Sequence, residues 1–183
     1  NTQVINKAQL LALQGDINVA LNQPQAAYDY YKQAVQGSYT EVLTINKLAQ
    51  VSLDIDRAHE VSVLLKTLIT RYPKRVFLVE SLGEHLLESG QHEDAIFYYS
   101  QLLTAPMPVI KQSIALNNLA FLYTQTKQYS LAIEHAKQAL KLRSDIPAFY
   151  DTLGWALTLS GQYNQGKKYL EQALSMAGES AEI

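Results

Sequence analysis

The sequence contains no cysteine and no long apolar run, and only 17% of its residues are charged. Without cysteine the chain has no disulfide, no thiol nucleophile and no thiolate metal ligand. No apolar stretch approaches the roughly 20 residues that a membrane-spanning helix requires, so we expect no direct membrane span. The formal net charge of −2 provides no concentrated positive surface for phosphates, so we expect no nucleic acid as a partner.

Sequence motifs of known chemistry are also missing. The chain has no Gly-rich phosphate loop, no GxSxG nucleophile elbow and no HExxH zinc-binding helix. His85 and His92 are seven residues apart, but the expected helix break at Gly90 lies between them, so we interpret both as packing or surface residues. We therefore predict no catalytic residue, no metal site and no cofactor. The chain is not expected to be an enzyme.

An internal repeat is the dominant feature of the sequence. Three series of mostly small residues run along the chain in register. The first has intervals of 34, 34, 37 and 34 residues and consists of Gly15, Ala49, Gly83, Ala120 and Gly154. The second follows 12 residues later at Ala27, Val61, Ala95, Ala132 and Gly166, and the third follows seven later at Ala34, Leu68, Leu102, Ala139 and Ala173. Three series in register indicate five copies of one structural unit.

Each copy is predicted to consist of two helices. In the last copy Pro147 suits the first turn of a helix, and Leu153 and Leu157 follow at the spacing of one buried stripe. Gly161 then breaks the helix, and a second stripe runs through Leu170. Equivalent breaks are expected at Asn22, Asp56, Gly90, Lys127 and Gly161. The small residues let the two helices of a pair approach closely, and the longer interval fits an insertion in the turn at 105–108.

Helix pairs at this period resemble tetratricopeptide repeats. The resemblance covers about residues 8–180 and is plainest in the fourth copy, in Leu116, Leu119, Ala120, Tyr123, Tyr129, Ala132, Ala139 and Leu140. It implies an all-α fold, a right-handed α-solenoid of about five helix pairs. We expect a single domain over residues 1–183, with repeats at 8–41, 42–75, 76–112, 113–146 and 147–180. Because the chain begins at Asn1 without methionine, we expect it to be a piece of a longer protein.

A narrower resemblance concerns the last copy. The run from Asp151 to Trp155, with Gln165, Gly166 and Leu170, is similar to repeats of bacterial cell-envelope lipoproteins that accompany exosortase protein-sorting systems. Such strings also occur in unrelated bacterial tetratricopeptide proteins. This resemblance favours the bacterial periplasm or cell envelope over the cytoplasm.

The family resemblance also implies a binding groove, because the first helix of each tetratricopeptide pair lines the concave surface. Register carries this role onto nine residues of this chain. They are Asp16, Asn46, Gln50, Glu80, Glu84, Asn117, Phe121, Asp151 and Trp155. We predict that they bind a peptide segment of a partner protein.

The chemistry of these nine residues restricts the ligand. They include no lysine or arginine, so a clamp for a partner's C-terminal carboxylate, which needs cations, is not expected. Amide side chains can hydrogen-bond a peptide backbone, and the Phe121 and Trp155 rings can hold an apolar side chain or a cation. We expect a segment with basic and apolar residues. For Glu80 and Glu84 a merely solvated helix face is an equally good interpretation.

The C-terminal end of the chain suggests a further contact. Leu170 and Leu174 would face solvent unless more repeats follow or copies of the chain associate end to end. The predicted function is therefore a protein–protein interaction scaffold. The alternative is a non-catalytic arm that recruits substrate to a larger multidomain enzyme or to an envelope export or sorting assembly.

Overall fold

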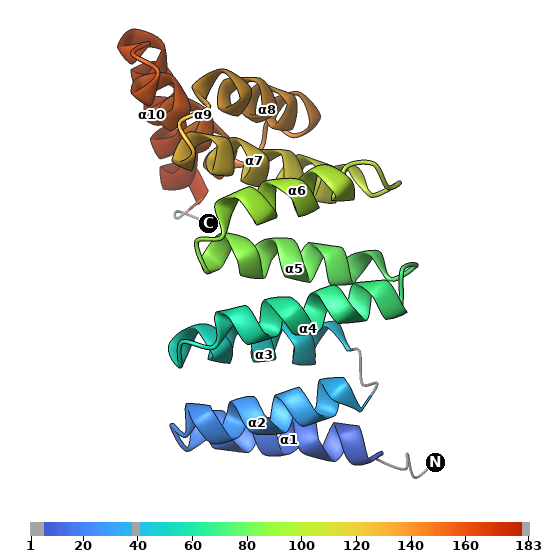
Figure 1. Cartoon of the computed structure of the whole chain (residues 1–183). Coiled ribbons are helices and arrows are strands. Elements are labelled where there is room, and N and C mark those ends of the chain that lie inside the picture. The colour runs from blue at the N-terminus through green and yellow to red at the C-terminus, as the bar shows by residue number, and fades with distance from the viewer. Residues whose placement is uncertain (1–5, 38–40, 181–183) are drawn as a thin grey trace. The chain divides into compact units, whose positions relative to one another are not determined.

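Helices make up most of the chain in the computed structural model, which describes residues 6–37 and 41–180 (Figure 1). Over these residues it has ten α-helices and no strand, which confirms the predicted all-α fold. The chain divides into two compact units, residues 1–89 and 90–183. Unit 1 holds α1 (Lys7–Ala20), α2 (Pro24–Gln36), α3 (Val42–Asp54), α4 (Ala58–Arg71) and α5 (Val76–Glu88). Unit 2 holds α6 (His92–Leu102), α7 (Val109–Gln125), α8 (Tyr129–Leu142), α9 (Pro147–Leu159) and α10 (Tyr163–Ser180).

The predicted breaks between paired helices are confirmed by the backbone. All five break residues have a left-handed conformation, with φ of 55° at Asn22, 57° at Asp56, 73° at Gly90, 60° at Lys127 and 85° at Gly161. A residue in this conformation ends a helix and lets the next N–H groups satisfy its last carbonyls. At four turns the following residue donates its N–H to the carbonyl five positions earlier, at 2.7–2.9 Å.

Small residues lie where the paired helices cross. A Cβ atom added to Gly15 of α1 would lie 2.4 Å from the Tyr31 ring of α2. In the last pair, a Cβ on Gly166 would lie 2.3 Å from the Thr158 hydroxyl oxygen and 2.8 Å from the backbone oxygen of Gly154. Favourable contacts between such atoms need about 3.5 Å. The paired helices therefore pack at a distance that only glycine permits at these positions.

The core of unit 1 forms between successive helices. Helix α1 packs on α2, α2 packs on α3, and α3 contacts both α4 and α5. The fully buried side chains include Leu48, Leu65 and Leu82, one from each of the last three helices. Burying a leucine stabilises the fold by about 1.5–3 kcal/mol. The aromatic part of this core comes from Tyr28 and Tyr31 of α2, each only 1% exposed.

His85 belongs to the core of unit 1. It is 1% exposed, and its Nε2 atom lies 2.8 Å from the carbonyl oxygen of Ala58 in α4. Since a carbonyl only accepts hydrogen bonds, Nε2 carries the proton. Burial lowers the pKa of His85, against the opposing influence of the Ala58 carbonyl and of Glu88. His85 is thus a neutral packing residue, as the sequence interpretation held.

The core of unit 2 is formed by α7, α8, α9 and α10. Small residues of α7 and α8 meet large ones of α9 in a fully buried cluster of Ala120, Ala136, Leu153 and Leu157. A second cluster joins Leu116, Ala139 and Phe149. Helix α7 begins after the turn at 103–108 and has 17 residues, compared with 13 in α9. The insertion expected in the turn therefore also lengthens α7 at its start.

Substituting Gly166 with alanine tests the close approach of α9 and α10. Alanine favours a helix by about 0.5–1 kcal/mol over glycine, but at this site the new methyl group would overlap backbone atoms of α9. We expect Gly166→Ala to lower the free energy of unfolding of unit 2 by about 1–3 kcal/mol, measured by urea denaturation.

Gly178 supplies the matched control for this substitution. It also lies in α10, and no atom comes within 4 Å of an added Cβ. Gly178→Ala should leave stability unchanged or raise it slightly. Equal behaviour of the two alanine variants would contradict the proposed helix contact.

Candidate functional site

The nine predicted groove residues all lie on the first helices of the pairs, but they fall into two sets, one in each unit. Unit 1 carries Asp16 on α1, Asn46 and Gln50 on α3, and Glu80 and Glu84 on α5. Unit 2 carries Asn117 and Phe121 on α7, and Asp151 and Trp155 on α9. Each set is therefore considered as a surface of its own unit.

In unit 1, Asp16 is occupied by partners from the same chain. Its Oδ1 atom accepts a hydrogen bond from the Tyr31 hydroxyl at 2.6 Å and forms an ion pair with Lys47 Nζ at 2.6 Å. Burial raises the pKa of Asp16, but the hydrogen bonds from Lys47 and Tyr31 and the charge of Lys47 together lower it. Asp16 therefore stays ionised and ties α1 to α2 and α3, instead of offering a free carboxylate.

Lys47 also changes the charge of this surface. Lys47 follows the predicted residue Asn46 in the sequence and was not itself among the nine predicted positions. Its ammonium group nevertheless contacts the predicted residue Asp16. The amide oxygen of Asn46 is itself occupied, since it accepts a hydrogen bond from the Ser81 hydroxyl of α5 at 2.9 Å. Gln50 and Glu84 are exposed and Glu80 is partly buried. Two of the five residues of the unit 1 set, Asp16 and Asn46, therefore hold neighbouring helices together.

In unit 2, three of the predicted residues line one cavity. Phe121 of α7 and Asp151 and Trp155 of α9 enclose a space of about 240 Å³. Thr124 and Thr152 complete its wall. Phe121 is 40% exposed and Trp155 is 46% exposed, although both are large aromatic residues. This cavity presents two aromatic rings and one carboxylate to solvent.

Two exposed isoleucines on α7 were not among the nine predicted groove residues. Ile110 and Ile114 precede Asn117 and Phe121 by seven residues each, so all four lie on one side of the helix. They are 37% and 42% exposed. The fourth repeat begins at residue 113, so its register left out Ile110 in the first turn of α7, whereas Ile114 lies inside the repeat but was not among the nine positions. The apolar i, i+4 spacing of the two isoleucines is the signal that could have found them.

Leu159 of α9 extends the apolar surface on the other helix. It lies one helical turn after Trp155 and is 41% exposed. Helices α7 and α9 pack against each other. We call the surface of Ile110, Ile114, Asn117, Phe121, Asp151, Trp155 and Leu159 the α7–α9 face.

Asn117 brings an unsatisfied hydrogen-bonding group to this helix. Its Oδ1 atom is buried, and no donor reaches it within residues 6–37 and 41–180. A buried carbonyl oxygen without a donor costs about 1–3 kcal/mol. Because this oxygen is buried, it is not an accessible acceptor on the α7–α9 face.

The described residues offer no arrangement for catalysis by a metal ion. In the part of the chain covered by residues 6–37 and 41–180, no group of three His, Asp or Glu side chains could hold a metal ion. No helix there is long and apolar enough to cross a membrane. The side chains of the α7–α9 face are suited to contact with another polypeptide, because they combine apolar rings, one carboxylate and one amide.

Comparison with protein families identifies the repeats. Models of the tetratricopeptide repeat match residues 114–145 and 147–180. The chain is also 26% identical over 140 residues to the Photosystem I assembly protein Ycf3 of Synechococcus elongatus, a match that covers 67% of this chain and 81% of that protein. This relative is named for assembly and not for a reaction.

Solved structures show the same fold along almost the whole chain. A crystal structure of MamA has a TM-score of 0.71 at 19% identity and covers 92% of this chain and 97% of that one. MamA from Desulfovibrio magneticus RS-1 has a TM-score of 0.74 at 14% identity, with 96% and 98% covered. TPR-like repeats of a putative kinesin light chain from Podosopora anserina have a TM-score of 0.74 at 16% identity, with 100% of both chains covered.

The fold and the comparisons together define a helical-repeat scaffold, a protein that binds other proteins. More specifically, residues 114–145 and 147–180 match the tetratricopeptide repeat, and the all-α fold of the chain is shared with solved structures that include TPR-like repeats.

Proposed function

We propose that this scaffold binds a segment of a partner protein on the α7–α9 face, and that the segment carries both apolar and basic side chains. The observation that carries the proposal is the cavity of Phe121, Asp151 and Trp155. Trp155 is the only tryptophan in the sequence, and it is 46% exposed. Tryptophan and other aromatic side chains are enriched among the residues that dominate binding energy at protein interfaces.

The cavity fits a basic side chain that ends in a cation. A lysine or arginine of the partner could place its aliphatic stem between Phe121 and Trp155, with its charge over the indole ring. Asp151 would then act as the counter-ion at the rim. A cation–π contact contributes about 0.5–2 kcal/mol, depending on how far it is removed from water.

The rest of the α7–α9 face fits apolar side chains. Ile110 and Ile114 on α7 and Leu159 on α9 are each about 40% exposed. Exposed apolar side chains that gather on one surface are typical of protein interaction sites.

The relative of this chain supports a role in assembly. Ycf3 is named a Photosystem I assembly protein, and we propose an analogous role, holding a partner during assembly, without assigning that photosystem to this chain. Location in the bacterial periplasm or cell envelope remains a prediction that follows only from the narrower sequence resemblance.

Replacing Phe121 and Trp155 with alanine tests the proposed site. The double variant should lose capture of partner proteins from the native source, with an affinity at least about 30-fold weaker, because truncating a dominant interface residue costs 2 kcal/mol or more. The measurement is affinity capture with mass spectrometry, followed by titration of the main captured protein. Circular dichroism should show an unchanged helix content, since neither residue belongs to the buried core.

Phe97→Ala provides the matched control, because Phe97 is an aromatic residue of α6 that is 55% exposed and lies outside the proposed site. It should capture the same partners as the parent chain. If the double variant captures them equally well, the proposed placement of the partner is wrong.

We also propose end-to-end self-association of the chain through its apolar ends. On α9 and α10 a cavity of about 450 Å³ is lined by residues that include Pro147, Leu170 and Leu174, and Leu174 is 75% exposed. On α1, Leu13 and Ile17 are 51% and 50% exposed. Terminal repeats with uncovered apolar faces favour stacking.

Substituting Leu174 with glutamate tests this self-association. Sedimentation over a range of concentrations should show the parent chain growing in mass and the Leu174→Glu chain remaining monomeric, because a buried unpaired carboxylate would oppose the contact. A parent chain that is monomeric at every concentration would contradict self-association and leave the α7–α9 proposal intact.

A further inference from the structure

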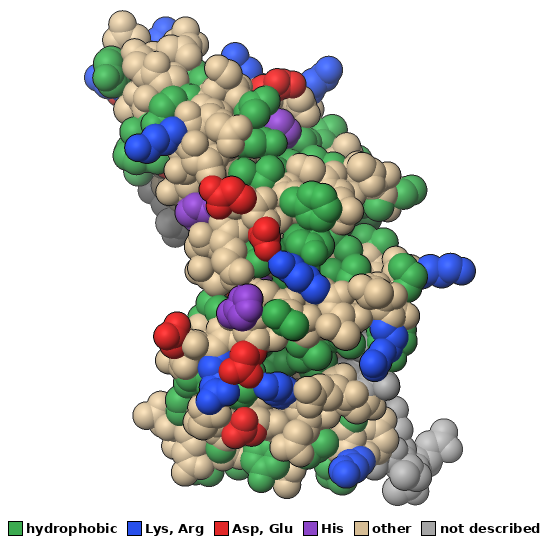
Figure 2. Space-filling view, in the orientation of Figure 1, with side chains coloured by type: hydrophobic (Ala, Val, Ile, Leu, Met, Phe, Trp, Pro, Cys, Tyr) green, Lys and Arg blue, Asp and Glu red, His purple; other side chains and the backbone are tan. Residues whose placement is uncertain are grey.

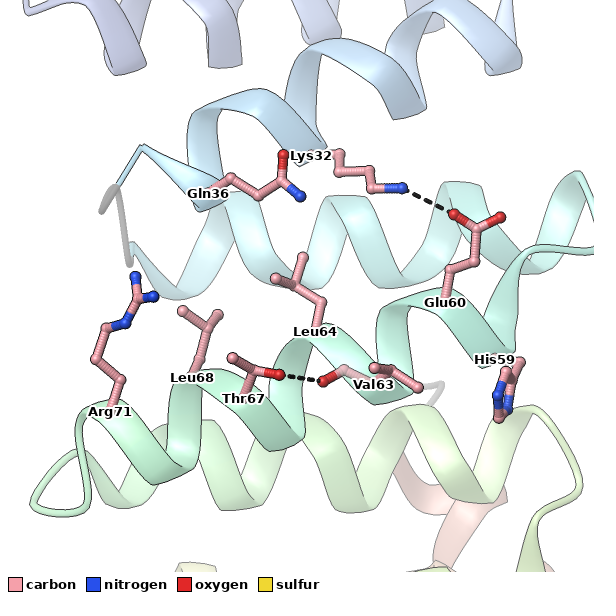
Figure 3. A pocket seen from close by; sticks show the side chains of 9 residues that line it. All are labelled: Lys32, Gln36, His59, Glu60, Val63, Leu64, Thr67, Leu68 and Arg71. Atoms are coloured by element: carbon pink, nitrogen blue, oxygen red, sulfur yellow. Dashed lines mark hydrogen bonds and ion pairs between the residues drawn. The ribbon is translucent and has the colours of Figure 1, made fainter.

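A second cavity lies on the other helices of unit 1, between α2 and α4. It has a volume of about 620 Å³, and its lining includes Lys32, Gln36, Glu60, Leu64, Leu68 and Arg71 (Figure 3). We call it the α2–α4 pocket. None of its residues belongs to the predicted groove, which lies on the first helix of each pair. Its volume is typical of binding sites in proteins.

The pocket is elongated and apolar in the middle. Leu64 and Leu68 of α4 lie between its two ends, with Lys32 and Gln36 of α2 on the opposite wall (Figure 3). Glu60 and Arg71 mark the ends. They are 11 residues apart on α4, which corresponds to about 16 Å at 1.5 Å per residue. The length suits three turns of a bound helix.

The Glu60 carboxylate, at one end of the pocket, already has hydrogen-bond donors at both oxygen atoms. Glu60 Oε2 accepts hydrogen bonds from Lys32 Nζ at 2.8 Å and from the Tyr28 hydroxyl at 3.0 Å, and Oε1 accepts one from Arg57 at 2.8 Å. The hydrogen bonds from Lys32 and Tyr28 and the charges of Lys32 and Arg57 lower the pKa of Glu60 to about 2. Two cations therefore surround one carboxylate, and this end keeps a positive charge.

Arg71 gives the other end a positive charge as well. It is the last residue of α4 and is exposed. Within residues 6–37 and 41–180 no carboxylate forms an ion pair with its guanidinium group. Figure 2 shows charged side chains of both signs gathered over α2 and α4. The pocket thus has an apolar centre and a positive charge at each end.

We propose that the α2–α4 pocket binds an acidic amphipathic helix of a second partner protein. Apolar side chains of that helix fill the space over Leu64 and Leu68, and an aspartate or glutamate pairs with Arg71. The choice of an acidic partner rests on charge complementarity, which sets the specificity of an interface. The chain then has two binding surfaces of opposite preference, which would let it hold two partners at once.

A pair of designed peptides tests the proposal. One is an amphipathic 15-residue helix with leucine on one face and glutamate on the other, and the second has lysine in place of every glutamate. Methyl NMR spectra of the full chain should show that the glutamate peptide shifts Val63, Leu64 and Leu68. The lysine peptide should leave these signals unchanged. Equal shifts with both peptides, or shifts of α7–α9 face methyl groups only, would overturn the proposal.

Substitutions at Arg71 distinguish charge pairing from general attraction. Arg71→Gln and Arg71→Glu should weaken binding of the glutamate peptide at least tenfold. Lys137→Glu makes the same charge change on an exposed residue of α8 and should leave binding unchanged. Equal weakening by Arg71→Glu and Lys137→Glu would overturn the pairing with Arg71, whereas binding at the α7–α9 face is measured independently by the Phe121 and Trp155 variants.

Discussion

The close contact between the two helices of each pair is the constraint on which the rest of the structure depends. Gly15 lies against the Tyr31 ring, and Gly166 lies against the backbone of α9, so these helix pairs leave no room for larger side chains. A left-handed residue in the turn within each pair reverses the chain over three residues. The large apolar side chains are then buried between neighbouring helices. As a result, one side of α7 and α9 is left to face solvent.

That exposed side explains why aromatic residues lie in water without destabilising the fold. The core of unit 2 is already filled by residues such as Leu153 and Leu157. Phe121 and Trp155 are not needed for it, and their exposure leaves apolar area available for a partner. Unit 1 differs, because Asp16 and Asn46 on its corresponding helices hydrogen-bond to neighbouring helices. Equivalent positions therefore hold neighbouring helices together in unit 1 and leave two aromatic rings exposed in unit 2.

The sequence was sufficient to predict the helices and their turns. The turn positions follow from the period of the small residues, and glycine, asparagine and aspartate occupy four of the five left-handed sites. Lys127 was placed by register alone, since lysine has no preference for that conformation. The cavity residues Phe121, Asp151 and Trp155 were also predicted by register. Whether a polar groove residue is free or occupied was not predictable, because it depends on distant side chains such as Lys47 and Ser81.

The α2–α4 pocket lay beyond sequence reasoning for a related reason. Its residues come from two second helices about 30 positions apart, and the cavity depends on the gap between them. Ile110 was missed because α7 begins one turn before the repeat register does. In both cases the register gives the positions that all repeats share, whereas the proposed binding surfaces depend on side chains and helix lengths that differ from one repeat to the next.

The most direct test of the open α7–α9 face uses the single tryptophan. Acrylamide quenching of Trp155 fluorescence reports the access of solvent to the indole, and it can be measured on the free chain and on its complex with a captured partner protein. If the α7–α9 face is open and binds the partner, quenching should be strong in the free chain and the indole should be markedly protected in the complex. Protection of the indole in the free chain, or identical quenching in both, would contradict this prediction.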